Sequence, residues 1–332
     1  MKDLGKNTVS RHRIAEESGG QRIDNYLLKI LKGVPKSHVY RILRSGEVRV
    51  NSGRIGPDYR LQPGDELRIP PVRVAERAPR GTPPANAGLE QAILFEDEHL
   101  LALNKPSGLA VHGGSGVSFG VIEQLRAQRP QARFLELVHR LDRDTSGVLL
   151  LAKKRSALTA LHAELRAGRV RKNYLTLVKG KWRNPKQSVR LNLHKYLLAS
   201  GERRVSVNVA GQKAHTVFEL VQAWREFSLL RAEIKTGRTH QIRVHLAHLG
   251  FPIAGDDKYG DFPLNKELAH AGLMRMFLHA SSVSFRHPGT GIILTLEAPL
   301  PDELQRFLRT LEQPVGLNSP YRLLKAKPAD HS

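Results

Sequence analysis

The residues best suited to chemistry gather in one polar stretch, 139–147, which reads His-Arg-Leu-Asp-Arg-Asp-Thr-Ser-Gly. Apolar runs flank it at 134–138 and 148–151. This order predicts a strand, a polar turn and then a second strand or a helix. Because catalytic side chains are often held on loops that a rigid scaffold positions, we expect acid or base chemistry on this turn.

Asp142 is the residue of this turn that we select as the reacting group. An aspartate with its ordinary pKa of about 3.9 is ionised at neutral pH, so it can act as a nucleophile or a base. A structural role in the turn is the alternative, and on the residues alone it is the commoner use of such an aspartate. Asp144 is the second candidate for the reacting carboxylate.

The same stretch narrowly misses the Asp-x-Asp-x-Thr/Val loop of magnesium-dependent phosphatases, and Asp256 and Asp257 could supply further acids. Cation binding is opposed by four nearby bases, which are His139, Arg140, Arg143 and Lys153.

A second metal hypothesis concerns His240, His245 and His248, whose spacing is compatible with one helix face. No carboxylate lies between them as in the known zinc motifs. Histidines on the surface or facing RNA are the simpler interpretation, and we predict no metal site.

The charge of the chain indicates a polyanionic partner. Its 332 residues include 53 Lys or Arg and 31 Asp or Glu, a formal net charge of +22, with 40% apolar residues. Nucleic acid is the commonest partner of such a basic, folded protein. An acidic membrane surface is the weaker alternative, because no run of about 18 apolar residues exists and the basic residues are dispersed.

Cysteine is absent from the sequence, which excludes disulfides, thiolate metal sites and cysteine nucleophiles. The first residues, Met-Lys-Asp-Leu-Gly-Lys-Asn, have no apolar core of a signal peptide, so we expect a cytoplasmic protein.

A small basic module is expected at 21–70. Apolar residues at helical spacing predict two short helices, and alternating segments near 46–53 and 61–69 predict strands. The module carries ten Lys or Arg against five acids, and Lys36, Arg41 and Arg44 can line the exposed side of the second helix. A solvated surface is the alternative explanation of these charges. The order of Arg22-Ile23-Asp24, this helix and the segment 46–51 resembles the S4 RNA-binding domain, which implies docking on structured RNA.

The rest of the chain predicts a larger, strand-rich domain. We expect an N-terminal tail at 1–20, a Pro-rich linker at 71–88, a mixed α/β domain at 89–322 and a C-terminal tail at 323–332. Helical periodicity is clearest at 156–165, which Ser156 could cap, and at 239–249. Runs typical of strands lie at 92–94, 100–103, 174–178, 216–220, 227–234 and 292–296.

The string at 139–147 resembles the signature of the RluA-type pseudouridine synthases. Three further segments agree in order and spacing, at 103–109, 172–174 and 235–245, and the last continues to 256. With the S4-like module, the resemblance covers about 300 residues. It implies a mixed, largely antiparallel catalytic sheet. The segments 111–120 and 140–144 look most like the branch of the family that acts on large-subunit ribosomal RNA.

The reaction of this family breaks the bond between sugar C1′ and uracil N1 and joins C1′ to C5. Nothing is oxidised or hydrolysed, so no cofactor is required and one ionised carboxylate suffices. The resemblance assigns that carboxylate to Asp142 and its arginine partner to Arg243. It implies that Tyr174 stacks on the base and can take part in proton transfer.

The target base must leave its stack, and the resemblance places Arg140 in the gap. A phosphate contact for Arg140, and core roles for Tyr174 and for Leu278 at an expected apolar wall, are the alternatives. The residues that we predict to contact RNA are Arg140, Lys36, Arg41, Arg44, Arg49, Lys105, Arg238 and His240.

The sequence therefore predicts a pseudouridine synthase of 23S ribosomal RNA that modifies more than one uridine. Its expected partner is 23S ribosomal RNA or a large-subunit assembly intermediate, with no membrane partner and a monomeric chain. The alternative function is a non-catalytic RNA-binding assembly factor that keeps only the fold.

Overall fold

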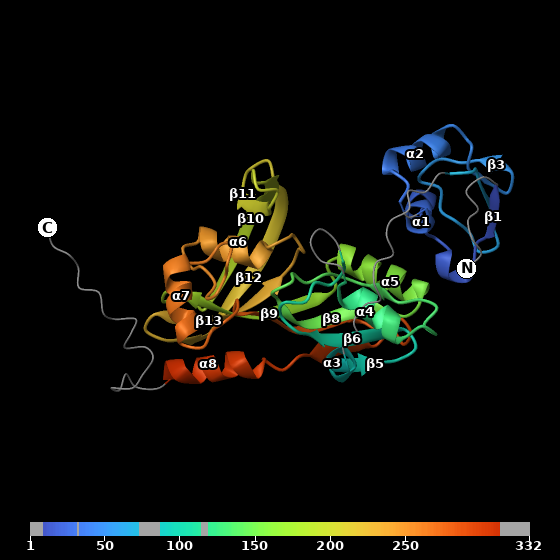
Figure 1. The fold of residues 1–332 in the computed structure, drawn as a ribbon. Helices are drawn as coiled ribbons and strands as arrows, with labels where there is room; N and C mark the ends of the chain where they lie inside the picture. The colour runs from blue at the N-terminus through green and yellow to red at the C-terminus, as the bar shows by residue number, and fades with distance from the viewer. Residues whose placement is uncertain (1–8, 32, 73–86, 114–118, 313–332) are drawn as a thin grey trace. The chain divides into compact units, whose positions relative to one another are not determined.

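The computed structural model describes residues 9–31, 33–72, 87–113 and 119–312 (Figure 1). They form two compact units, one built from the described residues up to 72 with 130–134 and the other from 87–129 with 135–312. Most of the expected linker, and the expected C-terminal tail, lie outside the described residues. Among the helices that are described, none is long and apolar enough to cross a membrane.

The small unit packs two helices on a four-stranded antiparallel sheet with the order β1-β4-β2-β3. The two predicted helices are confirmed: most of their apolar residues are buried, Tyr26 and Ile30 are partly buried, and Lys36, Arg41 and Arg44 are exposed. The sheet turns sharply between β2 and β3, where Asn51 and Ser52 both have positive φ, as a two-residue hairpin requires. The elements are β1 Ser10–Arg13, a 3-10 helix Glu16–Ser18, α1 Ile23–Ile30, α2 Lys36–Arg44, β2 Arg49–Val50, β3 Gly53–Arg54 and β4 Glu66–Ile69.

Strand β1 corrects the expectation that 1–20 is a tail, since all four of its residues pair with β4. Its sequence, Ser-Arg-His-Arg, contains no apolar residue and so gives no strand pattern. Backbone hydrogen bonds to β4 hold the strand, and such bonds leave no periodic pattern in the sequence.

The large unit is built on an eleven-stranded sheet with the order β11-β10-β12-β13-β9-β14-β8-β6-β5, to which β15 adds on β14 and β7 on β8. All of its pairs are antiparallel except β14 with β8. The predicted mixed, largely antiparallel fold class is confirmed. The strands are β5 Ile93–Glu96, β6 Leu100–Lys105, β7 Glu136–Leu137, β8 Ser146–Ala152, β9 Arg171–Lys179, β10 Lys186–Leu197, β11 Arg203–Val207, β12 Gln212–Ala223, β13 Phe227–Ile234, β14 Leu278–Arg286 and β15 Ile293–Glu297.

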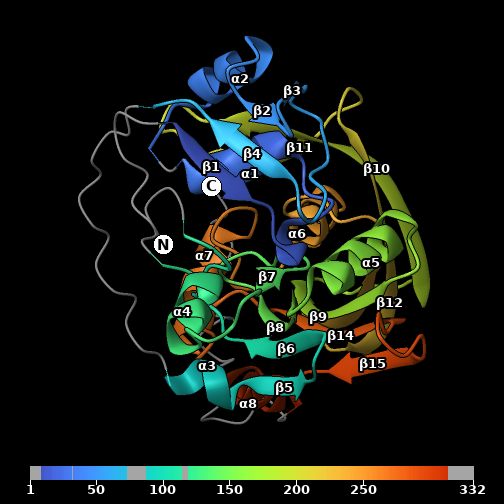
Figure 2. The same cartoon turned by 90° about the vertical axis from the view of Figure 1, so that its right-hand side faces the viewer.

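Helices cover both faces of this sheet: α4 and α5 lie on one side of β6 and β8 (Figure 2), and α7 and α8 pack against β9 and β13 on the other face. Alternation along β9 divides the core, because Tyr174 and Val178 join the cluster that contains α4 and α6, whereas Leu177 joins the cluster that contains α7 and α8. Tyr174 therefore faces the same side as α6. The helices are α3 Ala87–Gln91, α4 Val121–Gln128, α5 Arg155–Arg166, α6 Gln241–His248, α7 Phe262–His270 and α8 Asp302–Glu312.

Two helix starts differ from the sequence prediction. Helix α5 begins at Arg155 after Lys154, so Ser156 does not cap it. Helix α6 begins at Gln241, two residues later than expected, because His240 has a left-handed φ of 53°.

The element after the polar turn, predicted as a strand or a helix, is the strand β8. Every residue of β8 is buried, between β6 and β14. Gly147 allows β8 and β14 to approach closely, since a Cβ atom there would lie 2.2 Å from the carbonyl oxygen of Ala280. The turn that carries Asp142 thus runs into the centre of the sheet.

Candidate active site

A cavity of about 380 Å³ opens beside the polar turn and brings together side chains that are far apart in the sequence. The turn, β9, the start of α6 and the first residue of β14 all contribute to its walls. Of the predicted site residues, the cavity is lined by Arg140, Asp142, Tyr174, Arg238, His240, Arg243 and Leu278.

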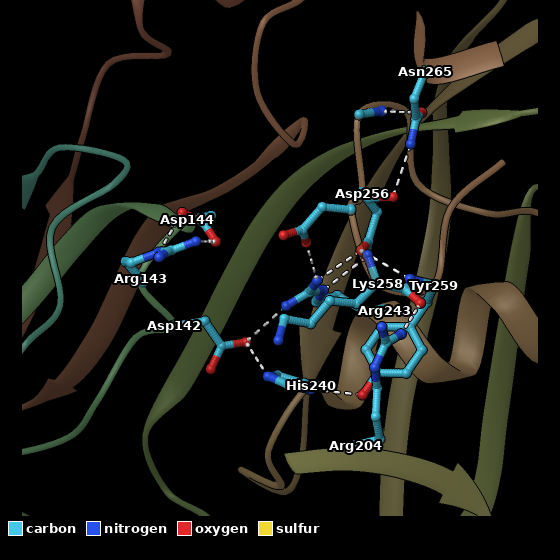
Figure 3. A network of polar contacts seen from close by, with 12 residues as sticks. Asp142, Arg143, Asp144, Arg204, His240, Arg243, Asp256, Lys258, Tyr259 and Asn265 are labelled. Carbon is cyan, nitrogen blue, oxygen red and sulfur yellow. Dashed lines mark hydrogen bonds and ion pairs between the residues drawn. The ribbon is translucent and has the colours of Figure 1, made fainter. Parts of the chain in front are cut away.

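Asp142 meets two nitrogen atoms of the α6 segment. Its Oδ2 lies 3.8 Å from Nη1 of Arg243 and 3.8 Å from Nε2 of His240 (Figure 3). Both distances exceed a normal hydrogen bond, and the Asp142 side chain keeps 21% of its surface exposed. The positive charge of Arg243 therefore offsets the negative charge of the carboxylate, which stays open to the cavity.

Arg243 is held rigidly, with only 2% of its side chain exposed. Its Nε and Nη2 donate to the two carboxylate oxygens of Asp256, at 2.8 and 2.6 Å. Burial opposes the charged form, but the hydrogen bonds and charge of Asp256, followed by the charge of Asp142, raise the pKa of Arg243 above its usual value. A bidentate pair of this kind leaves Nη1 as the atom that faces Asp142.

Hydrogen bonds of the Gln241 side chain hold the start of α6 where Arg243 can reach Asp142. The buried side-chain amide donates to Thr216 Oγ1 and the carbonyl oxygen of His215, and it accepts from Thr236 Oγ1 and the backbone N–H of Arg238. These contacts tie the first turn of α6 to β12.

Tyr174 and Leu278 form an apolar wall of the cavity, and both are buried. Burial, and then the charge of Asp142, raise the pKa of Tyr174, so its phenol is neutral at physiological pH. Lys172 lies two residues before Tyr174 on β9 and lines the same cavity, and burial lowers its pKa. Sequence analysis did not select Lys172, although strand alternation places it on the face of Tyr174.

The comparisons with known proteins identify the family. The family model for RNA pseudouridylate synthase matches residues 99–248, and the S4 domain model matches 21–67. Ribosomal large subunit pseudouridine synthase C of Escherichia coli O157:H7 is 57% identical over 303 residues, which cover 90% of this chain and 95% of that protein. The chain belongs to the RNA pseudouridylate synthases. The protein of the same name from Pasteurella multocida (strain Pm70) is 56% identical to this synthase over 92% of the chain and 94% of the relative.

The resemblance to the RluA family, and within it to the branch that acts on large-subunit ribosomal RNA, is thus confirmed. Solved structures agree with the fold of the synthase. Human RNA pseudouridylate synthase domain containing 4 has a TM-score of 0.55 at 25% identity, over 68% of this chain and 94% of that chain. Human RNA pseudouridylate synthase domain containing 1 has a TM-score of 0.53 at 21% identity, over 67% and 94%.

The structure contradicts the prediction that Lys105 contacts RNA, because its side chain has no exposed surface in the synthase. Its Nζ donates to three backbone carbonyl oxygens, including that of Arg143 at 3.0 Å. Burial, and then the charge of Arg275, lower the pKa of Lys105 to about 7. Lys105 therefore supports the polar turn and has no exposed surface with which to contact RNA.

Asp144 lies apart from the cavity. It forms an ion pair with Arg143 at 3.0 Å (Figure 3). It lines a different hollow. The remaining predicted contacts are on the surface: Arg140 and Arg238 are exposed at the cavity, and Lys36, Arg41, Arg44 and Arg49 are exposed on the small unit.

The described part of the synthase contains no group of three or more His, Asp or Glu side chains that could hold a metal ion. Asp256 and Asp257 both pair with Arg243, and His240 faces Asp142. His245, the third residue of the alternative metal cluster, is fully buried.

His245 makes the stability of the large unit depend on pH. Burial lowers its pKa to about 4, whereas a histidine in the unfolded chain titrates at about 6.5. Above pH 6.5 the ring is neutral in both states. As the pH falls below this value, the unfolded chain binds a proton that the folded chain does not, so stability decreases until the pH reaches about 4.

We expect that lowering the pH from 7.5 to 5 reduces the unfolding free energy of the wild-type protein by about 2 kcal/mol more than that of His245→Leu. Urea unfolding followed by tryptophan fluorescence measures this difference, since Trp182 and Trp224 both belong to the large unit. Equal losses in the two proteins would show that His245 is not the group responsible.

Proposed function

We propose that this synthase converts uridine to pseudouridine in the 23S RNA of the large ribosomal subunit, with Asp142 as the reacting carboxylate. The observation that carries the proposal is the Asp142 carboxylate beside a fixed, buried arginine in a cavity lined by Tyr174. The substrate class is supported by the relatives named ribosomal large subunit pseudouridine synthase C.

The chemistry balances with the groups that the chain supplies. The C1′–N1 bond breaks and a C1′–C5 bond forms, while C5 loses a proton and N1 gains one. Asp142 acts on the sugar, either as a nucleophile or as a base, and Arg243, whose Nη1 lies 3.8 Å from its Oδ2, supplies the positive charge beside it. Water, oxidant and reductant are not consumed.

The size of the cavity fits a single extruded nucleotide. A volume of about 380 Å³ is at the small end of ligand sites and is sufficient for one nucleotide. In this proposal the uracil stacks on Tyr174 against Leu278, and the exposed Arg140 at the rim takes the place that the base has left.

The proposal is tested by incubating the purified protein with unmodified 23S RNA in EDTA without nucleotide, and mapping pseudouridine by carbodiimide primer-extension stops. New stops support the proposal, and the number of stops tests the expectation that more than one uridine is modified. Tight RNA binding without stops, on naked RNA and on large-subunit particles, would contradict it. A non-catalytic assembly factor is not favoured, because Asp142, Tyr174 and Arg243 are all present and share one cavity.

We further propose that the S4 unit supplies affinity and the large unit supplies chemistry. Deleting residues 1–85 should weaken RNA binding and its salt dependence more than it lowers the rate at saturating RNA. The slope of log K against log salt should become shallower by about 0.7 for each single-stranded phosphate contact that is lost. The matched control is a full-length protein with Lys36→Ala, Arg41→Ala and Arg44→Ala. Its slope of log K against log salt should become shallower by part of the same amount. An unchanged affinity for RNA after the deletion would show that the S4 unit does not supply the affinity.

The expected cytoplasmic location and the 23S RNA or particle partner belong to the same proposal. We also propose that the protein is a monomer, and sedimentation of the free protein tests its oligomeric state.

A further inference from the structure

His240 is the second group, beside Arg243, that approaches the Asp142 carboxylate. Nε2 of His240 and Nη1 of Arg243 both lie 3.8 Å from the same oxygen, Oδ2 (Figure 3). In Figure 3 the other oxygen of the Asp142 carboxylate points away from these two nitrogen atoms. The two groups come from the residue before α6 and from the first turn of α6, so they are fixed relative to one another.

The other ring nitrogen of His240 is bound to Tyr259. Nδ1 lies 2.8 Å from the Tyr259 hydroxyl, and the two rings meet at 5.5 Å between centroids. The same hydroxyl accepts a hydrogen bond from the backbone N–H of Val205 at 2.9 Å. Tyr259 also packs against the guanidinium of Arg243, at 5.2 Å, so it contacts both groups that face Asp142.

These contacts favour one position of the ring proton. Because the Tyr259 oxygen accepts from Val205, its own proton is available to Nδ1 of His240, its other hydrogen-bond neighbour in the described part of the chain. A proton on Nδ1 would leave the phenol proton without an acceptor there. The arrangement in which these protein groups satisfy one another therefore has a bare Nδ1 and an N–H at Nε2, which faces Asp142.

The backbone at His240 is unusual. Its φ of 53° is left-handed, and the other non-glycine residues with positive φ in the described chain, Asn51 and Ser52, form the β2–β3 turn. Glycine or asparagine adopts this conformation more easily, so backbone geometry does not explain a histidine here. Strained residues of this kind persist where the surrounding structure holds them, often at functional sites.

We propose that His240 is a positioning residue for Asp142: its neutral imidazole directs Nε2–H to Oδ2, and Tyr259 sets the tautomer. This inference rests on the proposed function, in which Asp142 reacts with the sugar. Arg243 and His240 together hold Oδ2, so that Oδ1 is the oxygen presented to C1′. The 3.8 Å contact shortens to a hydrogen bond when substrate closes the site.

The proposal replaces the expectation that His240 contacts RNA. Both ring nitrogens already face protein groups, and only 12% of the side chain is exposed. Burial, followed by the positive charges of Arg243 and Lys258, outweighs Asp142 and lowers the pKa of His240. The imidazole therefore stays neutral at pH 7 and offers RNA phosphates no charge.

Three variants test the role of His240. His240→Asn tolerates the left-handed backbone and keeps a polar atom near Nδ1, but it lacks any group at the Nε2 position. His240→Gln carries an amide nitrogen that reaches the Nε2 position. Tyr259→Phe removes the hydroxyl that sets the tautomer and leaves His240 in place.

The measurement is the single-turnover rate of pseudouridine formation at saturating 23S RNA, with the RNA dissociation constant measured separately. His240→Asn should lower the rate about 10- to 100-fold and change the dissociation constant less than about two-fold. His240→Gln should recover most of the lost rate. Tyr259→Phe should lower the rate about three- to ten-fold without loss of affinity, since the imidazole can then turn a bare nitrogen toward the carboxylate.

A wild-type rate in His240→Asn, or a loss of affinity with an unchanged rate at saturation, would overturn the proposal. So would equal losses in His240→Asn and His240→Gln together with a wild-type rate in Tyr259→Phe. Unfolding midpoints from tryptophan fluorescence separate a change in rate from a failure to fold. If the wild-type protein itself forms no pseudouridine, the proposed function fails; if the wild type is active and the variants are unaffected, only this inference fails.

Discussion

Replacing Asp142 with asparagine should abolish pseudouridine formation and leave RNA binding intact. Asparagine has nearly the same shape but cannot act as a nucleophile or a base, so the single-turnover rate should fall by at least about 10³-fold. Primer-extension stops after carbodiimide treatment report the product, and a binding assay on the same RNA reports affinity. Losing the carboxylate next to Arg243 removes one negative charge, so affinity should be equal or slightly greater.

The matched control is Asp144→Asn, which removes the other acid of the turn. Asp144 pairs with Arg143 and lines a different hollow, so this variant should keep substantial activity. An inactive Asp144→Asn protein beside an active Asp142→Asn protein would reverse the assignment of the reacting carboxylate.

Replacing Arg243 with methionine should reduce both activity and stability. The variant leaves the Asp256 carboxylate buried without its bidentate partner, and removing one member of such a buried pair costs about 3–5 kcal/mol of unfolding free energy. The single-turnover rate should fall about 100-fold or more, because Asp142 loses the cation that holds it in place. Urea unfolding and the pseudouridine assay measure the two effects.

The double variant Arg243→Met, Asp256→Asn separates these effects. It removes the uncompensated buried charge, so it should recover part of the lost stability. It restores no cation beside Asp142, so the rate should remain as low as in the single variant. Recovery of the rate together with stability would show that Arg243 acts on folding alone.

The sequence determined the local features of this protein well. The polar turn at 139–147 is followed by the buried strand β8, and α1, α2 and most of the core strands lie where apolar spacing predicts them. These features depend on residues that are close in the chain, whose spacing is visible in the sequence. The family, and with it the grouping of Asp142, Tyr174 and Arg243 in one cavity, followed from motifs that are contiguous in the sequence.

Only the tertiary structure decided what each side chain contacts. Lys105 belongs to a motif but is buried under the turn, β1 pairs with a strand more than 50 residues away, and Asp256 holds the arginine that faces Asp142. His240 has its two ring nitrogens on Asp142 and Tyr259, which lie on opposite sides of it in the chain. Such contacts depend on strand order, register and the left-handed backbone before α6, which arise from the packing of the whole sheet and have no periodicity in the sequence.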